Sequence, residues 1–241
     1  MLSKNQSKLI TSLQRKKYRI QHQLFIAEGI KVVSELLSSA FTLEKLFCTE
    51  NGVSLFSNFN PQIISEKELS KISNFTTSNI VLAIFKIPPK SKIKEKGLIV
   101  GLDTINDPGN LGTIIRLCDW FNVAHIVCAS DTVDCYNPKV VQATMGSLAR
   151  VPITYTNLEA YLKKTALPVY GAVMDGENTY TAELLQNAIL VMGNESNGIS
   201  EKIRKLITTE ITIPRYGKST ITESLNVASA TAILLNEFRR R

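Results

Sequence analysis

The chain has 241 residues, 44% of them hydrophobic, which is enough to build one large domain or two small ones and argues against disorder. Lys and Arg total 28 against 21 Asp and Glu, so the formal net charge of +7 allows a polyanionic partner without requiring one. No stretch approaches the ~20 consecutive apolar residues that span a bilayer, and Met1 to Glu28 contains no apolar run typical of a secretion signal, so we expect a cytoplasmic protein rather than a membrane or secreted one.

The N-terminal part of the chain is typical of a small α/β unit. A basic helix is predicted near Lys4–Lys17, and apolar residues at helical spacing predict a second helix over Gly29–Ser39. Short apolar runs predict strands between and after these helices. The further elements are strands at Leu24–Ala27, Leu43–Cys48 and Ile80–Phe85, and a helix at Glu66–Ile72.

The clearest boundary along the chain is the segment Ile87–Gly97. Its two prolines, Pro88 and Pro89, restrict the backbone and remove hydrogen-bond donors, while its lysines repel one another. We therefore expect an extended linker here. It separates a domain over residues 1–90 from a second domain over residues 98–241.

Basic residues cluster before Lys31, within the linker and at Arg239–Arg241. Any one of these clusters is typical of a solvated surface. For the three clusters together, contact with a phosphate backbone is as good an interpretation as a solvated surface. Each Lys or Arg that neutralises a phosphate releases condensed counterions, which favours binding.

After the linker, short continuous apolar runs alternate with helical patterns. Apolar runs without alternation are typical of strands buried on both faces, and hence of a parallel sheet covered by helices. Ligands of such sheets bind beyond the carboxyl ends of the strands, which singles out the loops after Leu102, Met192 and Ile213. The predicted strands are Leu98–Leu102, His125–Cys128, Val169–Val173, Ile189–Met192 and Glu210–Ile213.

The first of these loops, Asp103–Gly112, opens a helix that we expect to carry Arg116 one turn in. Gly109 permits a tight turn, and a helix start offers free N–H groups and a positive dipole end. The pattern also fits an ordinary turn between a strand and a helix. Arg116 and Asn106 could face one cleft, where a guanidinium can hold two phosphate oxygens.

The other two loops are less informative alone. Leu190–Ile199 carries a glycine and then an acid after a buried strand, which also fits a simple turn before a helix at Ser200–Leu206. Ile213–Val227 leads into a long C-terminal helix whose small residues permit close packing, either within the core or against a second subunit.

Together and in this order, the three loops resemble the three motifs of the SpoU (TrmH) branch of the SPOUT methyltransferases, over about Leu98–Phe238. The segment Lys16–Gly29 resembles, more loosely, the small RNA-binding domain often fused ahead of this catalytic domain. The stretch Pro214–Ser224 is longer than in compact members. The motifs that carry the resemblance are Asn106…Gly109-Asn110-Leu111-Gly112…Arg116, Val191-Met192-Gly193-Asn194-Glu195-Ser196-Asn197-Gly198 and Ile213-Pro214…Ser224-Leu225-Asn226-Val227.

The resemblance implies an α/β catalytic domain with a mostly parallel sheet and a C-terminal trefoil knot, working as a homodimer. It implies methyl transfer from S-adenosylmethionine to a ribose 2′-hydroxyl of RNA, ribosomal RNA in preference to transfer RNA. The implied catalytic residues are Arg116, Asn106, Glu195, Ser224 and Asn226. The implied cofactor contacts are Gly193, Ile213, Leu225, Met192, Leu190 and Asn226. The expected RNA contacts are Lys16, Lys17, Arg19, Arg215 and Lys218.

Two other functions are compatible with the sequence. One is a non-catalytic RNA-binding module that retains the SPOUT fold, although the polar set of Arg116, Glu195 and Asn226 exceeds what binding alone requires. The other is a nucleotide-dependent enzyme that uses Gly109–Gly112 as a phosphate cradle. No metal is expected, because the four cysteines form no CxxC pair and a sulfonium cofactor brings its own leaving group.

Overall fold

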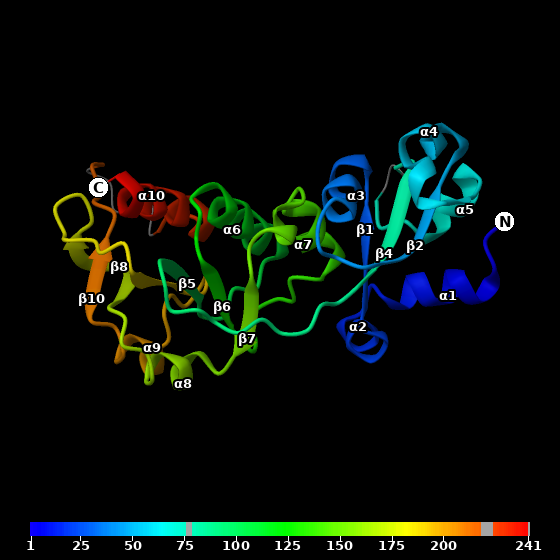
Figure 1. Ribbon diagram of the computed structural model, residues 1–241. Coiled ribbons are helices and arrows are strands. Elements are labelled where there is room, and N and C mark those ends of the chain that lie inside the picture. Colours follow the sequence, from blue (N-terminus) through cyan, green and yellow to red (C-terminus); the bar gives the residue numbers. More distant parts are fainter. Residues whose placement is uncertain (76–78, 218–223, 241) are drawn as a thin grey trace. The chain divides into compact units, whose positions relative to one another are not determined.

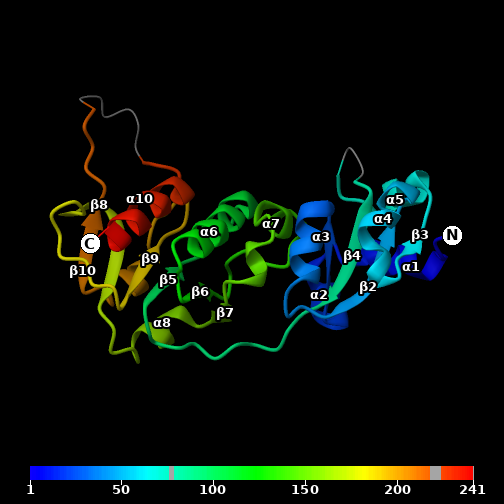
Figure 2. The same cartoon turned by 45° about the horizontal axis from the view of Figure 1, so that its top comes forward.

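The computed structural model describes residues 1–75, 79–217 and 224–240, and it divides into two compact units. Unit 1 comprises Met1–Pro89 together with Asp134–Arg150, and unit 2 comprises Lys90–Val133 together with Val151–Arg241. Each unit has its own sheet and its own hydrophobic core. The elements of both are labelled in Figures 1 and 2.

Unit 1 is built on a four-stranded sheet in the order β1-β4-β2-β3. β4 pairs antiparallel with β1 and β2, and the short β3 lies parallel to β2. The sequence predicts β1, β2 and β4 to within one residue at each end, whereas β3 is too short to produce a pattern. The strands are β1 Leu24–Glu28, β2 Leu43–Cys48, β3 Gln62–Ile63 and β4 Val81–Lys86.

The single helix expected over Lys4–Lys17 is in fact two helices, since Arg15 between them has an extended backbone. Arg19 explains the break. Its Nη1 donates to the carbonyls of Leu13 and Gln14, each at 2.9 Å, and so satisfies groups at the end of the first helix. The described helices of unit 1 are α1 Lys4–Ser12, α2 Lys16–His22, α3 Ile30–Leu37, α4 Val53–Phe56, α5 Glu66–Ile72 and α7 Pro138–Ala143, with 3-10 turns at Glu50–Gly52, Ser57–Phe59 and Ser147–Ala149.

Arg19 departs from the expected set of RNA contacts. Only 2% of the residue is exposed, and its Nε and Nη2 donate to one carboxylate oxygen of Asp134 at 2.9 and 2.6 Å. A buried guanidinium whose donors are occupied in this way is not accessible to a phosphate. We therefore remove Arg19 from the RNA contacts, because its charge serves the interior of unit 1.

The segment 134–150 packs onto the first part of the chain at two further points. The ring of Tyr136 lies 4.8 Å from that of Phe25, centroid to centroid. Gly146 has a left-handed backbone (φ +97°) and approaches Glu35 so closely that a Cβ atom at this position would lie 2.5 Å from the Glu35 Cβ. These contacts make a segment from the second half of the sequence part of unit 1.

Unit 2 holds a six-stranded sheet in the order β10-β8-β9-β5-β6-β7, in which the described pairings are parallel. β5, β6 and β9 are buried along their whole length, as their continuous apolar runs predict. β7 escaped prediction because its Ile-Thr-Tyr-Thr sequence alternates and is only half-buried. The strands are β5 Leu98–Leu102, β6 His125–Ala129, β7 Ile153–Thr156, β8 Val169–Asn178, β9 Ala188–Met192 and β10 Thr209–Thr212.

Helices cover both faces of this sheet (Figures 1 and 2). α6 Pro108–Trp120 and α10 Val227–Arg240 lie side by side on one face, while α8 Leu158–Leu162 and α9 Glu201–Arg204 lie on the other. Arg239 of α10 fixes this first pair, since its Nε donates at 2.7 Å to the carbonyl of Phe121, directly after α6. This member of the C-terminal basic cluster therefore belongs to the fold.

The predicted linker contains no helix or strand, as expected, but it is bonded to unit 2. The hydroxyl of Thr154 in β7 donates to the carbonyl of Ser91 at 3.1 Å, and the N–H of Gly97 donates to the side chain of Asn187 at 2.7 Å. Ile93 packs against the core of the sheet. The linker is thus held along its length by the unit that follows it.

These elements confirm the predicted α/β fold with a mostly parallel sheet. The trefoil knot stays a prediction. Within the residues that the structure describes, no helix combines the length and the apolarity needed to cross a membrane.

Removing the carboxylate of Asp134 should destabilise the protein strongly, because the buried guanidinium of Arg19 would lose its partner. We expect Asp134→Ala to lower the free energy of unfolding by about 3–5 kcal/mol, measured by urea denaturation. The matched control is Glu44→Ala, which breaks an exposed 3.4 Å pair with Lys86 in the same unit and should cost about 1 kcal/mol or less. Equal losses for the two variants would contradict the importance of burial.

Candidate active site

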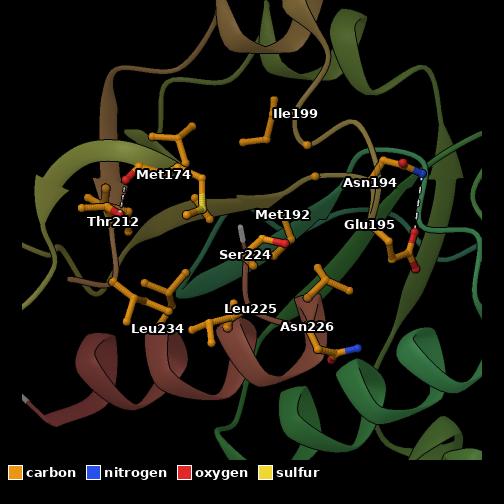
Figure 3. Close-up of a pocket in the computed structure, with 18 of the residues that line it drawn as sticks. Met174, Met192, Asn194, Glu195, Ile199, Thr212, Ser224, Leu225, Asn226 and Leu234 are labelled. Carbon is orange, nitrogen blue, oxygen red and sulfur yellow. Dashed lines mark hydrogen bonds between the residues drawn. The ribbon is translucent and has the colours of Figure 1, made fainter. Parts of the chain in front are cut away.

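A cavity of about 1130 Å³ opens in unit 2, beside the middle of β8 and next to the carboxyl ends of β9 and β10. Figure 3 shows Met174 and Thr212 at one end of it and Asn194 and Glu195 at the other. The end with Asn194 and Glu195 offers the polar groups that a reaction centre needs. The lining residues come from 172–175, 192–199, 211–217 and 224–234, with Asp107, Asn110 and Arg204 in addition.

The carboxylate of Glu195 bonds the loop after β9 to the loop after β5. It accepts from the backbone N–H groups of Asn106 and Asp107, both at 3.2 Å, and from the side-chain amide of Asn110 at 3.0 Å. Both carboxylate oxygens are used. Two of the three loops that the sequence singles out therefore meet at this side chain.

Asn110 extends the connection to the third loop. Its Oδ1 accepts from the side-chain amide of Asn226 at 2.9 Å. Asn226 in turn caps α10, because its Oδ1 accepts from the backbone N–H groups of Ala228 and Ser229. The three loops are thus joined through one series of side chains, Glu195–Asn110–Asn226.

Asn110 is a site residue that the sequence analysis missed in favour of Asn106. Asn106 gives Glu195 only its backbone N–H, and its side chain does not line the cavity. The signal for Asn110 was present, since Asp107 followed by Pro108 marks a helix start, and Asp107 does cap the helix by accepting from the Asn110 N–H at 2.8 Å. That start places Asn110 in the first turn.

The start of α6 is already neutralised by carboxylates of the protein itself. Glu195 accepts from the N–H groups of Asn106 and Asp107, and the Asp107 side chain accepts from that of Asn110. A helix start binds anions through such N–H groups and its positive dipole end. The alternative of a phosphate cradle at Gly109–Gly112 therefore loses its physical basis.

Glu195 is held in its ionised form. Burial opposes its ionisation, but hydrogen bonds from the side chain of Asn110 and from the backbone of Asn106 and Asp107 outweigh burial, so its pKa lies below the ordinary value. A carboxylate of lowered pKa with both oxygens engaged is a poor proton acceptor. Its chemistry suits it to hold the loops in place.

Leu190 is the one expected cofactor contact that the structure places away from the cavity. It is fully buried in β9, two residues before Met192, and so lies on the same face of the strand but deeper in the core. The assignment of Leu190 to the cofactor is corrected on this ground. The other expected residues that line the cavity are Met192, Gly193, Glu195, Ile213, Ser224, Leu225 and Asn226.

Arg116 is exposed on α6 and is not among the residues that line the cavity. It lies more than two turns into the helix rather than one, because α6 begins at Pro108. Asn110 precedes it by six residues, or about 9 Å along the helix axis. Trp120, one turn further on, is 83% exposed.

The expected RNA contacts are spread over both units. Lys16 and Lys17 are exposed on α2, and Arg215 is exposed and lines the cavity. Lys218 lies outside the described residues. In the part of the chain that the structure describes, no group of three or more His, Cys, Asp and Glu side chains could hold a metal ion.

Two family models match consecutive parts of this chain. The model of the SpoU rRNA Methylase family matches residues 97–236, and that of the MRM3-like substrate binding domain matches residues 4–83. The fold and the cavity define an α/β protein with a ligand site at the carboxyl edge of a parallel sheet. The chain belongs to the SpoU rRNA methylase family.

Three relatives are similar over nearly their whole length. The chain is 29% identical over 234 residues to the 23S rRNA (guanosine(2553)-2′-O)-methyltransferase RlmP of Bacillus subtilis, which covers 94% of this chain and 93% of that protein. A solved structure of a TrmH-family protein from Porphyromonas gingivalis has a TM-score of 0.90 and 41% identity, over 100% of this chain and 99% of that one. An AdoMet-bound rRNA methyltransferase from Sinorhizobium meliloti has a TM-score of 0.86 and 29% identity, over 100% and 97%.

Gly193 should tolerate no side chain, because a Cβ atom there would lie 2.2 Å from the carbonyl carbon of Gly198. We expect Gly193→Ala to lower the free energy of unfolding by about 1–3 kcal/mol, and thermal denaturation would measure this loss. Gly217→Ala is the control, since a Cβ atom at Gly217 would have no neighbour within 4 Å and should change little. If the two variants melted together, the close approach at Gly193 would be refuted.

The contribution of Glu195 to stability should depend on pH. A carboxyl group whose pKa is lowered in the folded state stabilises the fold above its unfolded pKa, near 4.5, and this contribution is lost as the pH falls through the folded pKa. We expect Glu195→Gln to cost about 1 kcal/mol near neutral pH, since the group is partly exposed. In urea denaturation at a series of pH values, the difference from wild type should shrink below pH 4.5. A difference independent of pH would show that the charge is not involved.

Proposed function

We propose that the protein transfers a methyl group from S-adenosylmethionine to a ribose 2′-hydroxyl of ribosomal RNA. The observation that carries this proposal is the joining of three sequence-distant loops, through Glu195, Asn110 and Asn226, at the polar end of one cavity. Membership of the SpoU rRNA methylase family supports it, as do relatives that are named as rRNA methyltransferases.

The residues that line the cavity fit S-adenosylmethionine. Met192, Ile211 and Leu234 are buried and give the cavity an apolar floor suited to an adenine ring. Gly193 lets the loop after β9 pack closely on itself, since a Cβ atom there would lie 2.2 Å from the carbonyl carbon of Gly198, and this packing shapes the cavity wall. Bound S-adenosylmethionine supplies an activated methyl group on a sulfonium that is its own leaving group.

The main task of the chain is to align the sugar hydroxyl with this methyl group. Alignment of two reactants can supply roughly 7–11 kcal/mol of the barrier. We assign to Glu195 the task of holding the loops after β5 and β9 together. The Asn226 amide uses one of its two N–H groups on Asn110, so its second N–H and the hydroxyl of Ser224, both on the cavity, can position the ribose.

We assign to Arg116 the orientation of the acceptor RNA. Its guanidinium can hold a phosphate next to the reacting ribose in two parallel hydrogen bonds, and its charge can stabilise the oxygen as it attacks. Arginine is a poor proton acceptor because its pKa lies above about 12, so removal of the hydroxyl proton is not assigned to it. Its exposure on α6 supports access by RNA.

The partners follow from the same proposal. Trp120 is 83% exposed on α6, and an aromatic side chain of this size in water supports a homodimer in which a second copy covers it. Lys16, Lys17 and Arg215 are the exposed cations proposed for the RNA backbone. A ribosomal RNA acceptor would place the protein in the cytoplasm, and a knotted cofactor pocket is proposed on the family resemblance.

The test uses large-subunit ribosomal RNA isolated from cells that lack the gene, incubated with methyl-labelled S-adenosylmethionine. We expect label at a linkage that resists alkaline hydrolysis, because a methylated 2′-oxygen cannot attack the neighbouring phosphate. Arg116→Ala should reduce transfer by about 100-fold or more, while the rise in melting temperature caused by S-adenosylmethionine remains. Arg116→Lys keeps the charge but loses the planar fork, and should be nearly as damaging.

Two results would contradict the proposal in different ways. Full activity of Arg116→Ala would remove the arginine from the mechanism and leave the reaction in place. If S-adenosylmethionine did not stabilise the wild-type protein, the non-catalytic RNA-binding module would become the better description.

A further inference from the structure

The cavity is larger than one small-molecule ligand needs. Pockets for cofactors and similar ligands typically enclose about 300–1,000 Å³, and this one measures about 1130 Å³. Space therefore remains beside the proposed cofactor. The second reactant, a nucleotide of the acceptor RNA, has to enter that space if its ribose is to reach the polar end.

The apolar side chains of the cavity divide into a floor and a rim. Met192 and Leu234 form the floor and are 2% and 1% exposed, whereas Met174, Leu225 and Tyr216 form the rim and are 59%, 50% and 83% exposed. Apolar groups that line a cavity yet face water are typical of a surface that a second molecule covers. The rim is therefore where the acceptor should make its contacts.

Tyr216 is the aromatic residue among the described residues of the cavity wall. It follows the end of β10 by four residues and stands next to Arg215, which is also exposed. With 83% of the residue exposed, most of the Tyr216 ring is in contact with water. The faces of the ring are accessible to a flat partner.

A nucleobase is the partner that this arrangement fits best. Proteins hold single-stranded RNA by stacking its bases on aromatic rings while cationic side chains contact the backbone. Tyr216 and Arg215 supply one group of each kind at adjacent positions. The adenine of the cofactor would instead find the buried floor, where its whole surface can leave water.

We propose that the ring of Tyr216 stacks on a nucleobase of the acceptor RNA and so holds the strand with one ribose at the Glu195–Asn226 end of the cavity. This inference rests on the proposed function. Because every base has a π-face, the stack gives affinity and placement rather than a choice of base.

The test separates the ring from its bulk. Tyr216→Phe keeps the ring and Tyr216→Leu keeps only an apolar side chain of similar reach. Leu185→Ala removes a 46% exposed apolar side chain of unit 2 that does not line the cavity, as a control. With large-subunit ribosomal RNA as acceptor, we expect Tyr216→Leu to lower kcat/KM by about 5- to 100-fold through a higher KM for RNA. Tyr216→Phe and Leu185→Ala should stay within about twofold of wild type, and the Kd of S-adenosylmethionine should be unchanged throughout.

Three outcomes would overturn the inference. One is equal kcat/KM for Tyr216→Leu and wild type. A second is a weaker Kd for S-adenosylmethionine in Tyr216→Leu, which would assign the ring to the cofactor. A third is loss of a dimer in sedimentation of Tyr216→Leu, which would assign the ring to a second copy of the chain.

Failure of the proposed function would look different. The wild-type protein would then bind S-adenosylmethionine or RNA but methylate no ribosomal RNA. Filter binding of the same RNA would still decide the role of Tyr216, because wild-type affinity in Tyr216→Leu would refute the stack and weaker binding, restored in Tyr216→Phe, would support it.

Discussion

The site depends on one carboxylate placed at the start of one helix. Glu195 accepts from the N–H groups of Asn106 and Asp107, the two residues directly before α6, and so places its charge near the positive dipole end of that helix. Because this charge comes from the loop after β9, the bonds that neutralise the helix also fix the distance between two loops that are remote in the sequence. Asn110 then transmits the constraint to Asn226 and to the start of α10. The polar end of the cavity exists because these bonds are made.

The sequence was most informative where burial is complete. β5 and β9 are continuous apolar runs, which predict buried strands of a parallel sheet. Because the carboxyl ends of such strands meet at one edge of the sheet, the sequence alone locates the loops of the site. Arg19 shows the opposite case. Its partner Asp134 lies 115 residues away, and no local pattern reveals that a cation in a basic segment is buried against it. The prediction that Leu190 contacts the cofactor was wrong for a related reason. An apolar residue near the end of a strand fits a core and a ligand site equally well.

At the level of side chains, the precision of helix boundaries limited the prediction. The family motif pointed to Asn106 rather than Asn110, and the expected start of α6 placed Arg116 one turn too early. The helical repeat then decides which side chains share a face with the cavity. Asp107 as a helix cap, with a proline directly after it, is enough to predict that α6 starts at Pro108. The position of Arg116 in the helix could therefore be predicted correctly from the sequence. The pairing of Asn110 with Asn226 was not foreseeable, because it depends on how α6 and α10 lie together.

The chain passes between its two units three times, because residues 134–150 leave the catalytic sheet after β6 and return before β7. A domain attached through one linker can be exchanged as a cassette, by recombination or by a chimera joined at that linker. Here such an exchange would separate Phe25 from Tyr136 and Arg19 from Asp134. The N-terminal segment and the β6–β7 excursion of this chain therefore form one structural unit, and replacing that unit would require two coordinated alterations of the gene.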